Sequence, residues 1–514
     1  MKRLPIGIQS IEKILLNNYI YVDKTMLIYQ LIGEAENYFF ARPRRFGKSL
    51  LVSTLKAIFS GDRGLFKDCQ LYLADYDWKK YPIIHLDFTQ IVTKNPEALE
   101  ESLKRKLIEI AQSYGKSIEI FSLQEGLSAL VKALAEDAPV VVLIDEYDKP
   151  LIDNLGQLEV AKQNRSLLKD FFGTLKGLDN YLRFVFVTGV SKFSQVSLFS
   201  GFNNLNDITI NPKYSTLVGY TEAEISLYFK EHIEQVAQKQ HKTVKEIIDL
   251  MRRWYNGYDF SGEKLTVYNP FSTLLFLNNG KVSNYWFQTA TPTFLIDQIK
   301  KQNQPLDLLS NVQVGETTFN SHDLDNMNLT SLMWQTGYLT IKNYDPSTLL
   351  YFLDYPNEEV RVSFVEHLAQ GITGMSMPLA NNYVRECVLA LRECRLEIFF
   401  DKLKVFFANI PYEIHVSKEK YYQTVFYVIA KLIGLEAQVE VQTNIGRVDM
   451  VVVADNFIYV FEFKINASAD EALTQINDKK YFQKYLDQKK KVVLIGVNFN
   501  TKEGNISDWK VLNL

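Results

Sequence analysis

Cysteine is scarce in this sequence, and long apolar runs are missing. The 514 residues include three cysteines, Cys69, Cys387 and Cys394, which cannot form a disulfide framework and lack the close C-x-x-C spacing of zinc sites. The last two are seven residues apart, a spacing that predicts one shared helix face. No segment reaches the roughly 18 to 20 apolar residues that span a bilayer, and the first residues lack the apolar stretch of a signal peptide. These absences favour a soluble, cytoplasmic chain without a membrane partner.

An excess of one charge is also missing. The chain has 57 Lys and Arg against 60 Asp and Glu, a net charge of -3. Residues 411–514 are balanced as well, with 13 basic and 13 acidic residues. Because a nearly neutral chain has no general attraction for polyanions, any role with nucleic acid has to come from a particular site.

Proline and glycine are few, at 14 and 24 residues, and 47% of the chain is hydrophobic, which is typical of globular proteins. The length suggests about three structural units. Over the first 215 residues apolar strands alternate with amphipathic helices, the pattern of a parallel sheet covered on both faces. The predicted strands span 38–41, 83–88, 140–144 and 184–188, and the predicted helices include 48–60 and 97–114.

Changes in this pattern predict four regions and an α/β fold class. An α/β domain spans residues 1–215 and is followed by a helical lid or middle region, 216–345. A linker region covers 346–400, and a helix is expected near 382–400. The last region, 401–514, reads as a compact α/β domain with a hairpin, a helix over 470–487 and a final strand over 491–497.

A phosphate-binding loop follows the first predicted strand. The strand 38–41 runs into R-P-R-R-F-G-K-S and then into a helix. In such loops the backbone N–H groups hold phosphates, the Lys reaches the β and γ phosphates, and the Ser hydroxyl binds Mg²⁺. Arg42 stands where this motif usually has its first Gly, and the three loop arginines suggest additional phosphate contacts. The residues expected to bind ATP are Arg44, Arg45, Phe46, Gly47, Lys48 and Ser49.

Two carboxylates, Asp145 and Glu146, end the most apolar strand of the chain. In P-loop ATPases the Asp at this place holds Mg²⁺ and the following Glu positions the attacking water, so Asp145 and Glu146 are expected to do so here. A strand that simply runs into a solvated loop would look the same. Thr188 ends another apolar strand and is a weaker candidate for sensing the γ-phosphate.

A second charged site is predicted in a hairpin near the C-terminus. If Asp455 and Asn456 form its turn, Asp449 lies directly across from Glu462, and Lys464 shares the face of Glu462. Opposed carboxylates repel each other unless a cation lies between them, so this pair predicts a metal site. Apolar residues flank these charges. The alternative is a half-exposed strand pair, shifted by one residue, whose charges point to solvent.

The spacing D-x12-E-x-K resembles that of the PD-(D/E)XK nuclease superfamily. The resemblance implies a restriction-endonuclease-like domain in which Asp449 and Glu462 bind Mg²⁺ and Lys464 positions or activates the water that attacks a phosphodiester. Members often have an acidic residue on the preceding helix and a Gln on the following helix. Here these are matched by Glu419 and Gln475.

Several further stretches resemble one bacterial family as a set: 4–7 (L-P-I-G), 21–25 (Y-V-D-K-T), 42–49 (R-P-R-R-F-G-K-S), 145–150 (D-E-Y-D-K-P), 254–258 (W-Y-N-G-Y) and 356–360 (P-N-E-E-V). Together they resemble the AAA-ATPase-like family with a C-terminal PD-(D/E)XK nuclease-like domain. The resemblance implies that 1–215 is an AAA-like P-loop ATPase domain and that Arg42 is a family trait.

Two functions follow from these patterns. The first is an ATPase coupled to a Mg²⁺-dependent nuclease that acts on DNA or RNA. The second is an ATP-operated switch or interaction protein, whose nuclease-like fold only binds nucleic acid or another partner. A homo-oligomer is left open, and Arg183, Arg252 and Arg253 are candidates for an arginine offered to a neighbouring subunit.

Overall fold

The computed structural model describes residues 1–192, 198–199, 202, 204–287, 295–296, 312–320, 328–373, 377–409, 426, 436–442, 447–486 and 489–514. The chain divides into two compact units, one formed by Met1–Thr289 with Val312–Glu359 and the other by Ala290–Asn311 with Val360–Leu514. Most of the predicted helical lid therefore belongs to the same unit as the N-terminal sheet. The predicted linker 346–400 contains the strand β8 and the helices α15 and α16.

The first unit is built on a five-stranded sheet with the order β2-β3-β4-β1-β5, in which all four strand pairs are parallel. Its strands are β1 (Asn37–Ala41), β2 (Ile83–Asp87), β3 (Val140–Asp145), β4 (Leu182–Gly189) and β5 (Asn206–Asp207). Every residue of β1 and β3 is buried. The predicted parallel sheet is confirmed, and the carboxyl ends of these strands share one edge.

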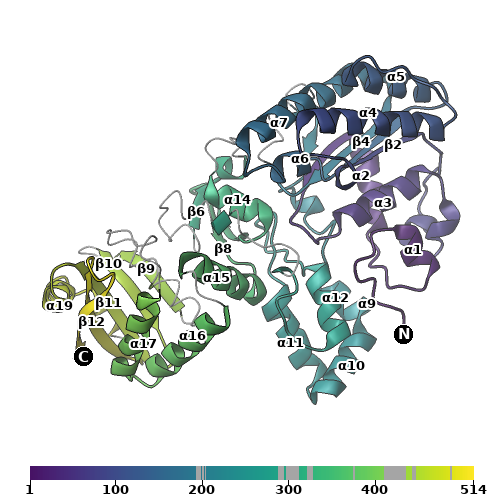
Figure 1. Ribbon diagram of the computed structural model, residues 1–514. Coiled ribbons are helices and arrows are strands. Elements are labelled where there is room, and N and C mark those ends of the chain that lie inside the picture. Colours follow the sequence, from purple (N-terminus) through teal and green to yellow (C-terminus); the bar gives the residue numbers. More distant parts are fainter. Residues whose placement is uncertain are drawn as a thin grey trace. The chain divides into compact units, whose positions relative to one another are not determined.

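Helices cover both faces of this sheet (Figure 1). They are α1 (Ile11–Leu16), α2 (Thr25–Glu34), α3 (Lys48–Phe59), α4 (Pro96–Ser113), α5 (Leu123–Ala135), α6 (Lys149–Ile152) and α7 (Leu158–Gly173). Helix α3 follows the phosphate-binding loop and packs on β3, while α4, α5 and α7 pack on one another. The apolar spacing of α3 buries Leu51, Leu55 and Ile58 completely or nearly so.

A helical part completes one side of the first unit. It contains α9 (Glu222–Tyr228), α10 (Lys230–Gln240), α11 (Val244–Tyr255) and α12 (Pro270–Asn279). Thr221 and Thr243 cap α9 and α11 with capping boxes, which explains where these helices begin. Ile20 and Val22 of the N-terminal segment lie in the same apolar cluster as these helices.

A small antiparallel sheet with the order β6-β8-β7 also belongs to the first unit. Its strands are β6 (Val312–Gly315), β7 (Thr340–Asp345) and β8 (Leu350–Asp354), and α14 (Leu329–Thr336) precedes β7. Gly337 ends α14 with a φ of 91°, and an added Cβ there would lie 2.7 Å from Pro43 of the phosphate-binding loop. This close approach packs the end of α14 directly on the loop.

The second unit is a five-stranded mixed sheet with the order β13-β12-β11-β10-β9. Its strands are β9 (Glu436–Gln442), β10 (Arg447–Val453), β11 (Phe457–Ile465), β12 (Lys491–Asn500) and β13 (Asn505–Asn513), and its helices are α16 (Met377–Arg392), α17 (Leu396–Ala408) and α19 (Ala469–Asp478). Helix α15 (Glu358–Thr373) begins in the first unit and continues the chain into the second. Strands β11 and β12 are parallel and are joined through α19, while the other pairs are antiparallel.

Alternation along β11 gives its two sets of side chains different partners. Phe461 and Phe463 contact Phe426, and Phe463 also contacts Phe499, which in turn contacts Phe407 of α17. Ile458 and Val460 pack with Ile476 of α19. Glu462 and Lys464 lie on the same face of β11 as Ile458 and Val460, because alternate residues of a strand share a face. This face is directed toward α19.

Three expectations from the sequence need correction. The helix expected over 382–400 is two helices, because the chain turns at Cys394, where φ is 54°. The prediction that Cys387 and Cys394 share one helix face is therefore wrong. The helix expected over 470–487 ends at Asp478, and Lys480 has a φ of 47°. Strand β13 was not predicted, because its exposed edge position tolerates polar residues that hide the alternation.

Among the described residues, every helix is too short or too polar to cross a bilayer.

Gly496 offers a test of the packing in the second unit. A Cβ on this β12 residue would lie 2.3 Å from the carbonyl oxygen of Ala469 and 2.9 Å from the nitrogen of Leu473, both in α19. We expect Gly496→Ala to push α19 off the sheet and to lower the free energy of unfolding by about 1 to 3 kcal/mol, measured by urea unfolding. Gly33→Ala in α2 is the control, since nothing lies within 4 Å of its Cβ position. An unchanged midpoint for Gly496→Ala would contradict the close packing of α19 on β12.

Candidate functional site

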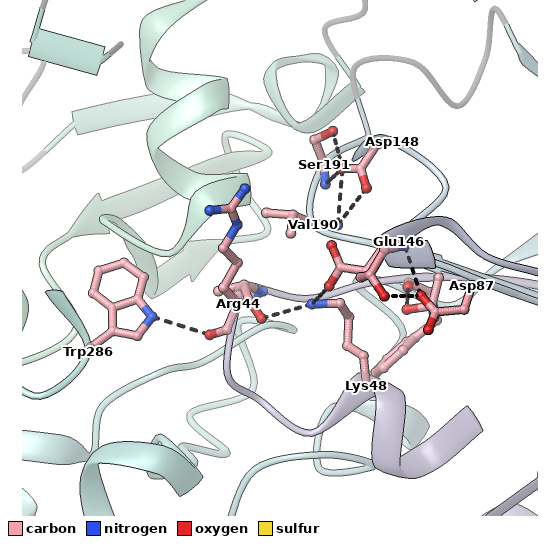
Figure 2. A network of polar contacts seen from close by, with 12 residues as sticks. Arg44, Lys48, Asp87, Glu146, Asp148, Val190, Ser191 and Trp286 are labelled. Atoms are coloured by element: carbon pink, nitrogen blue, oxygen red, sulfur yellow. Dashed lines mark hydrogen bonds and ion pairs between the residues drawn. The ribbon is translucent and has the colours of Figure 1, made fainter. Parts of the chain in front are cut away.

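The phosphate-binding loop connects β1 to α3 and contains two residues with positive φ, Arg45 at 69° and Gly47 at 97°. A Cβ at Gly47 would meet no atom within 4 Å, so the backbone conformation and not lack of space calls for glycine there. Lys48 begins α3, is 4% exposed, and its Nζ donates to the carbonyl oxygen of Pro43 at 3.2 Å. Glu146 Oε1 lies 3.8 Å from the same Nζ (Figure 2).

Arg42 lies inside the first unit, away from the expected phosphate position. Its guanidinium stacks on Phe40 and Phe260, 4.4 and 4.1 Å from the ring centroids. The Nη1 atom donates to the carbonyl oxygens of Ala41 and Thr209. Burial lowers the pKa of Arg42 to about 9, although the charge of Asp207 raises it. The expectation that all three loop arginines contact phosphate is therefore wrong for Arg42.

The middle of the loop is held by aromatic residues. The Phe46 ring lies 4.7 Å from Tyr258 and 5.5 Å from Phe260, so this side chain anchors the loop and leaves its backbone available for a ligand. Arg44 and Arg45 are exposed, and the guanidinium of Arg45 lies 4.7 Å from the ring of Phe271.

Carboxylates gather where β2 and β3 end. Asp145 pairs in register with Asp87, and Asp145 lies near Ser49 and Lys48 of α3. Burial raises the pKa of Asp145 to about 6, a bond with Ser49 and the charge of Lys48 lower it, and the charges of Glu146 and Asp87 raise it. The Oδ1 atom of Asp145 is buried and has no hydrogen-bond partner among the described residues.

Thr188 lies one residue from the end of β4 and is completely buried. Its hydroxyl donates to the carbonyl oxygen of Phe40 at 2.7 Å, across to β1. The side chain thus joins two central strands, and a role at the γ-phosphate stays a prediction.

A cavity of about 430 Å³ lies beside the loop. The whole stretch from Arg44 to Leu51, together with Glu146, forms one part of its wall. The other part is largely apolar and comes from the N-terminal segment and the helical part, with Ile8, Val22, Leu217, Pro270 and Phe271. A polar end at a helix N-terminus and an apolar end suit a nucleotide with its phosphates and base.

The hairpin of the second unit has the predicted register. Met450 pairs with Phe461, and Ala454 and Phe457 close the turn with two backbone hydrogen bonds. The next position in this register places Asp449 across from Glu462. Asp449 Oδ2 accepts a hydrogen bond from the backbone nitrogen of Phe463 at 2.7 Å. Asp449 thus contacts the strand of Glu462 at the residue that follows Glu462.

Lys464, Gln475 and Glu462 form a connected polar group. Lys464 Nζ donates to Gln475 Oε1 at 2.6 Å, and Gln475 Nε2 donates to Glu462 Oε1. Lys464 Nζ also lies 3.6 Å from Glu462 Oε1, and the Glu462 side chain is 2% exposed. The Gln expected from the family pattern thus bridges the other two residues from α19.

Glu419, the expected acidic residue of the preceding helix, lies outside the described residues. Within the described ranges no three His, Cys, Asp or Glu side chains are arranged as a metal cluster. The exposed Lys491 lies at the opposite end of the sheet from Lys464. Lys491 pairs with Phe457 at the start of β11, whereas Lys464 is near the end of that strand.

Comparison with known proteins identifies the domain in which each group of residues lies. Residues 5–199 match the family described as "Predicted AAA-ATPase", and residues 417–509 match the PD-(D/E)XK nuclease superfamily. The "Uncharacterized protein in vnfD 5'region" of Azotobacter chroococcum mcd 1 is 35% identical over 528 residues, covering 100% of this chain and 99% of that protein. This chain belongs to the AAA-ATPase-like family with a C-terminal PD-(D/E)XK nuclease domain. The family and the α/β fold class expected from the sequence are confirmed.

Some residues near the loop of this AAA-ATPase-like protein were not predicted. Asp87 ends a buried strand just as Asp145 does, so the same strand-end signal marks it. Trp286 carries no such signal, yet its Nε1 donates to the carbonyl oxygen of Arg44 at 3.2 Å (Figure 2). Its backbone nitrogen donates to Glu359 Oε1 at 2.9 Å, and Ser272 Oγ donates to the same oxygen.

Glu359 makes the stability of the ATPase-like unit depend on pH. The side chain is completely buried, and burial raises its pKa from 4.5 to about 8. Because the folded chain holds this proton more tightly than the unfolded chain, the contribution of Glu359 to stability is fully present below about pH 4.5 and is lost as the pH rises toward 8. The contribution is about 1.4 kcal/mol per pH unit within this window.

We expect Glu359→Gln, which resembles the protonated acid, to remove this decline. Urea unfolding of the variant and the wild type at several pH values from 6 to 8 measures the difference, which should grow with pH. Glu358→Gln, at the neighbouring half-buried carboxylate, is the matched control. A constant difference across this range would contradict a protonated Glu359.

Proposed function

We propose that this protein binds and hydrolyses ATP in its first unit and cleaves phosphodiester bonds of nucleic acid in its second unit, with Mg²⁺ at both sites. The observation that carries the nuclease part is the group of Glu462, Gln475 and Lys464 beside Asp449. The observation that carries the ATPase part is the cavity whose wall combines the phosphate-binding loop with Glu146, directly after β3. Action in the cytoplasm and assembly into a homo-oligomer stay predictions from the sequence.

In the first unit the loop residues, Lys48 and Glu146 take separate roles in the proposed ATP hydrolysis. Backbone N–H groups from Arg44 to Ser49 surround the phosphates at the start of α3. Lys48 moves its contact from Glu146 and Pro43 to the β and γ phosphates. Glu146 then orients the attacking water, as the Glu after the strand-end Asp does in P-loop ATPases.

The oxygen atoms at both sites suit Mg²⁺, which prefers carboxylate and hydroxyl oxygens and keeps several waters. Ser49 and Asp145 would hold it in the first unit, where Asp145 Oδ1 is buried without a hydrogen-bond partner in the described chain. Asp449 and Glu462 would hold it in the second unit. The ion neutralises phosphate charge and lowers the pKa of a bound water.

In the second unit Lys464 is the residue that acts on the water. Its side chain is 26% exposed, so its ammonium group is accessible from solvent. A hydrogen bond to Gln475 and an ion pair with Glu462 fix the position of this group. A positive charge at this position orients the attacking water and stabilises charge that develops on the phosphate. Gln475 fixes the position of both partners, because its amide donates to one and accepts from the other.

A second candidate is an ATP-operated switch whose nuclease-like unit only binds a partner. The balanced charge of residues 411–514 favours this alternative, since strong binding of nucleic acid usually requires a basic excess.

The two units are proposed to be coupled through Trp286 and Glu359. Trp286 contacts the phosphate-binding loop through Arg44 and contacts Glu359 through its backbone. Glu359 lies in the first turn of α15, the helix that continues into the second unit. A shift of the loop on ATP binding would therefore reach α15 through two hydrogen bonds.

The proposed nuclease is tested with labelled single- and double-stranded DNA and RNA, Mg²⁺ and the full chain. We expect Lys464→Ala to lower the cleavage rate at least about 100-fold, because the group that orients the water is lost. Lys479→Ala is the matched control, since this exposed lysine lies after the end of α19. Lys48→Ala should abolish ATP turnover. Intact substrates in every reaction, with ATP still bound, would favour the switch.

Trp286→Phe tests the coupling. The phenyl ring keeps most of the packing but cannot donate to Arg44, so we expect ATP affinity to stay within about twofold while the effect of ATP on cleavage falls by at least half. Trp334→Phe, at another buried tryptophan of the first unit, is the control. An unchanged ATP effect in Trp286→Phe would exclude this route.

A further inference from the structure

Glu146 has an unusual backbone for its residue type. Its φ is 55°, in the left-handed region that favours glycine. A non-glycine residue in this region costs about 1 to 3 kcal/mol and persists only where its surroundings hold it. Glu146 is also the carboxylate next to Lys48, so the strained residue faces the cavity.

The two residues after Glu146 are both fixed to the end of β4. Asp148 Oδ2 accepts hydrogen bonds from the backbone nitrogens of Val190 and Ser191, at 3.1 and 2.7 Å, and from the Ser191 hydroxyl at 2.7 Å (Figure 2). The Tyr147 hydroxyl donates to the carbonyl oxygen of Ser191 at 2.8 Å. The backbone nitrogen of Tyr147 donates to the carbonyl oxygen of Thr188 at 3.2 Å.

These contacts leave no free space. Tyr147 and Asp148 are completely buried. A Cβ on Gly189 would lie 2.4 Å from Asp148 Oδ1 and 2.6 Å from the Tyr147 ring, so glycine is required where β4 passes them. Burial and the charge of Glu146 raise the pKa of Asp148, whereas the bonds from Ser191 lower it. The cost of burying this carboxylate is offset only while the end of β4 stays in place.

Asp148 does not itself face the cavity. The wall residues there include Glu146 and Lys149 on either side of it, whereas the Asp148 side chain points to Val190 and Ser191. Its effect on a bound nucleotide therefore has to pass through the backbone of Glu146.

We propose that Asp148 is a positioning residue which, through Val190 and Ser191, holds Glu146 in the backbone conformation that points its carboxylate at the attacking water. This inference rests on the proposed hydrolysis of ATP. It makes the end of β4 part of the hydrolytic site, although Val190 and Ser191 are not among the wall residues of the cavity.

The test is a double-mutant cycle of Asp148→Asn and Glu146→Gln, with ATP turnover measured under single-turnover conditions. Asn keeps one acceptor oxygen but has no charge, and its NH2 group cannot accept the second contact of the Val190 nitrogen. We therefore expect Asp148→Asn alone to lower the rate at least about tenfold, with ATP affinity within about twofold. In the Glu146→Gln chain the same change should lower the rate by less than about twofold, because the residue on which Asp148 acts is already lost. Ser191→Ala, which removes one of the three bonds, should give a smaller loss.

Tyr114→Phe separates positioning from simple loss of stability. The variant lacks the hydroxyl of Tyr114, which accepts a hydrogen bond from the backbone nitrogen of Ile83 at 2.9 Å in the same unit, away from the cavity wall. It should lower the melting temperature without a matching loss of turnover. If Asp148→Asn does not fold, Ser191→Ala is carried through the same cycle.

An equal loss from Asp148→Asn in both backgrounds would overturn the inference and leave the ATPase intact. A wild-type chain that binds ATP without turning it over would overturn both proposals.

Discussion

The cost of keeping carboxylates in apolar surroundings underlies both sites of this protein. Asp145 ends a strand in which every residue is buried, and Glu462 lies on a strand flanked by phenylalanines. A buried carboxylate is stable only when hydrogen bonds or cations compensate the lost hydration. In the first unit Ser49 and Lys48 do so, and in the second Gln475 and Lys464. The partners of each carboxylate are thus the ones that its burial requires.

Much of this arrangement was predictable from the sequence, because it depends on local patterns. A buried strand that stops at Asp145 marks an edge of a parallel sheet, and a two-residue turn sets the register of Asp449 against Glu462. Both inferences depend mainly on the alternation of side chains between the two faces of a strand. The bridge made by Gln475 needed the family pattern in addition, since nothing in the local sequence of α19 distinguishes it from a surface glutamine.

What was not predictable depends on contacts between distant segments. Trp286 meets Arg44 across 242 positions, and Arg42 donates hydrogen bonds to two residues that follow it by more than 160 positions. The composition of the middle of the chain gives no sign of these contacts. The turn at Cys394 was missed for a different reason, because a residue other than glycine or asparagine rarely ends a helix with positive φ.

Arg42 explains how a loop without its usual first glycine keeps its shape. Position 42 is not one of the positive-φ positions of the loop, which are Arg45 and Gly47, so its backbone suits an ordinary residue. Its guanidinium is enclosed by two rings and bonded to Ala41 and Thr209, which fixes the start of the loop to the core. A glycine at this position could adopt many backbone conformations, and it would lose conformational entropy when a ligand ordered it. Here that ordering is completed during folding, so the first residue of the loop is already fixed before any ligand binds.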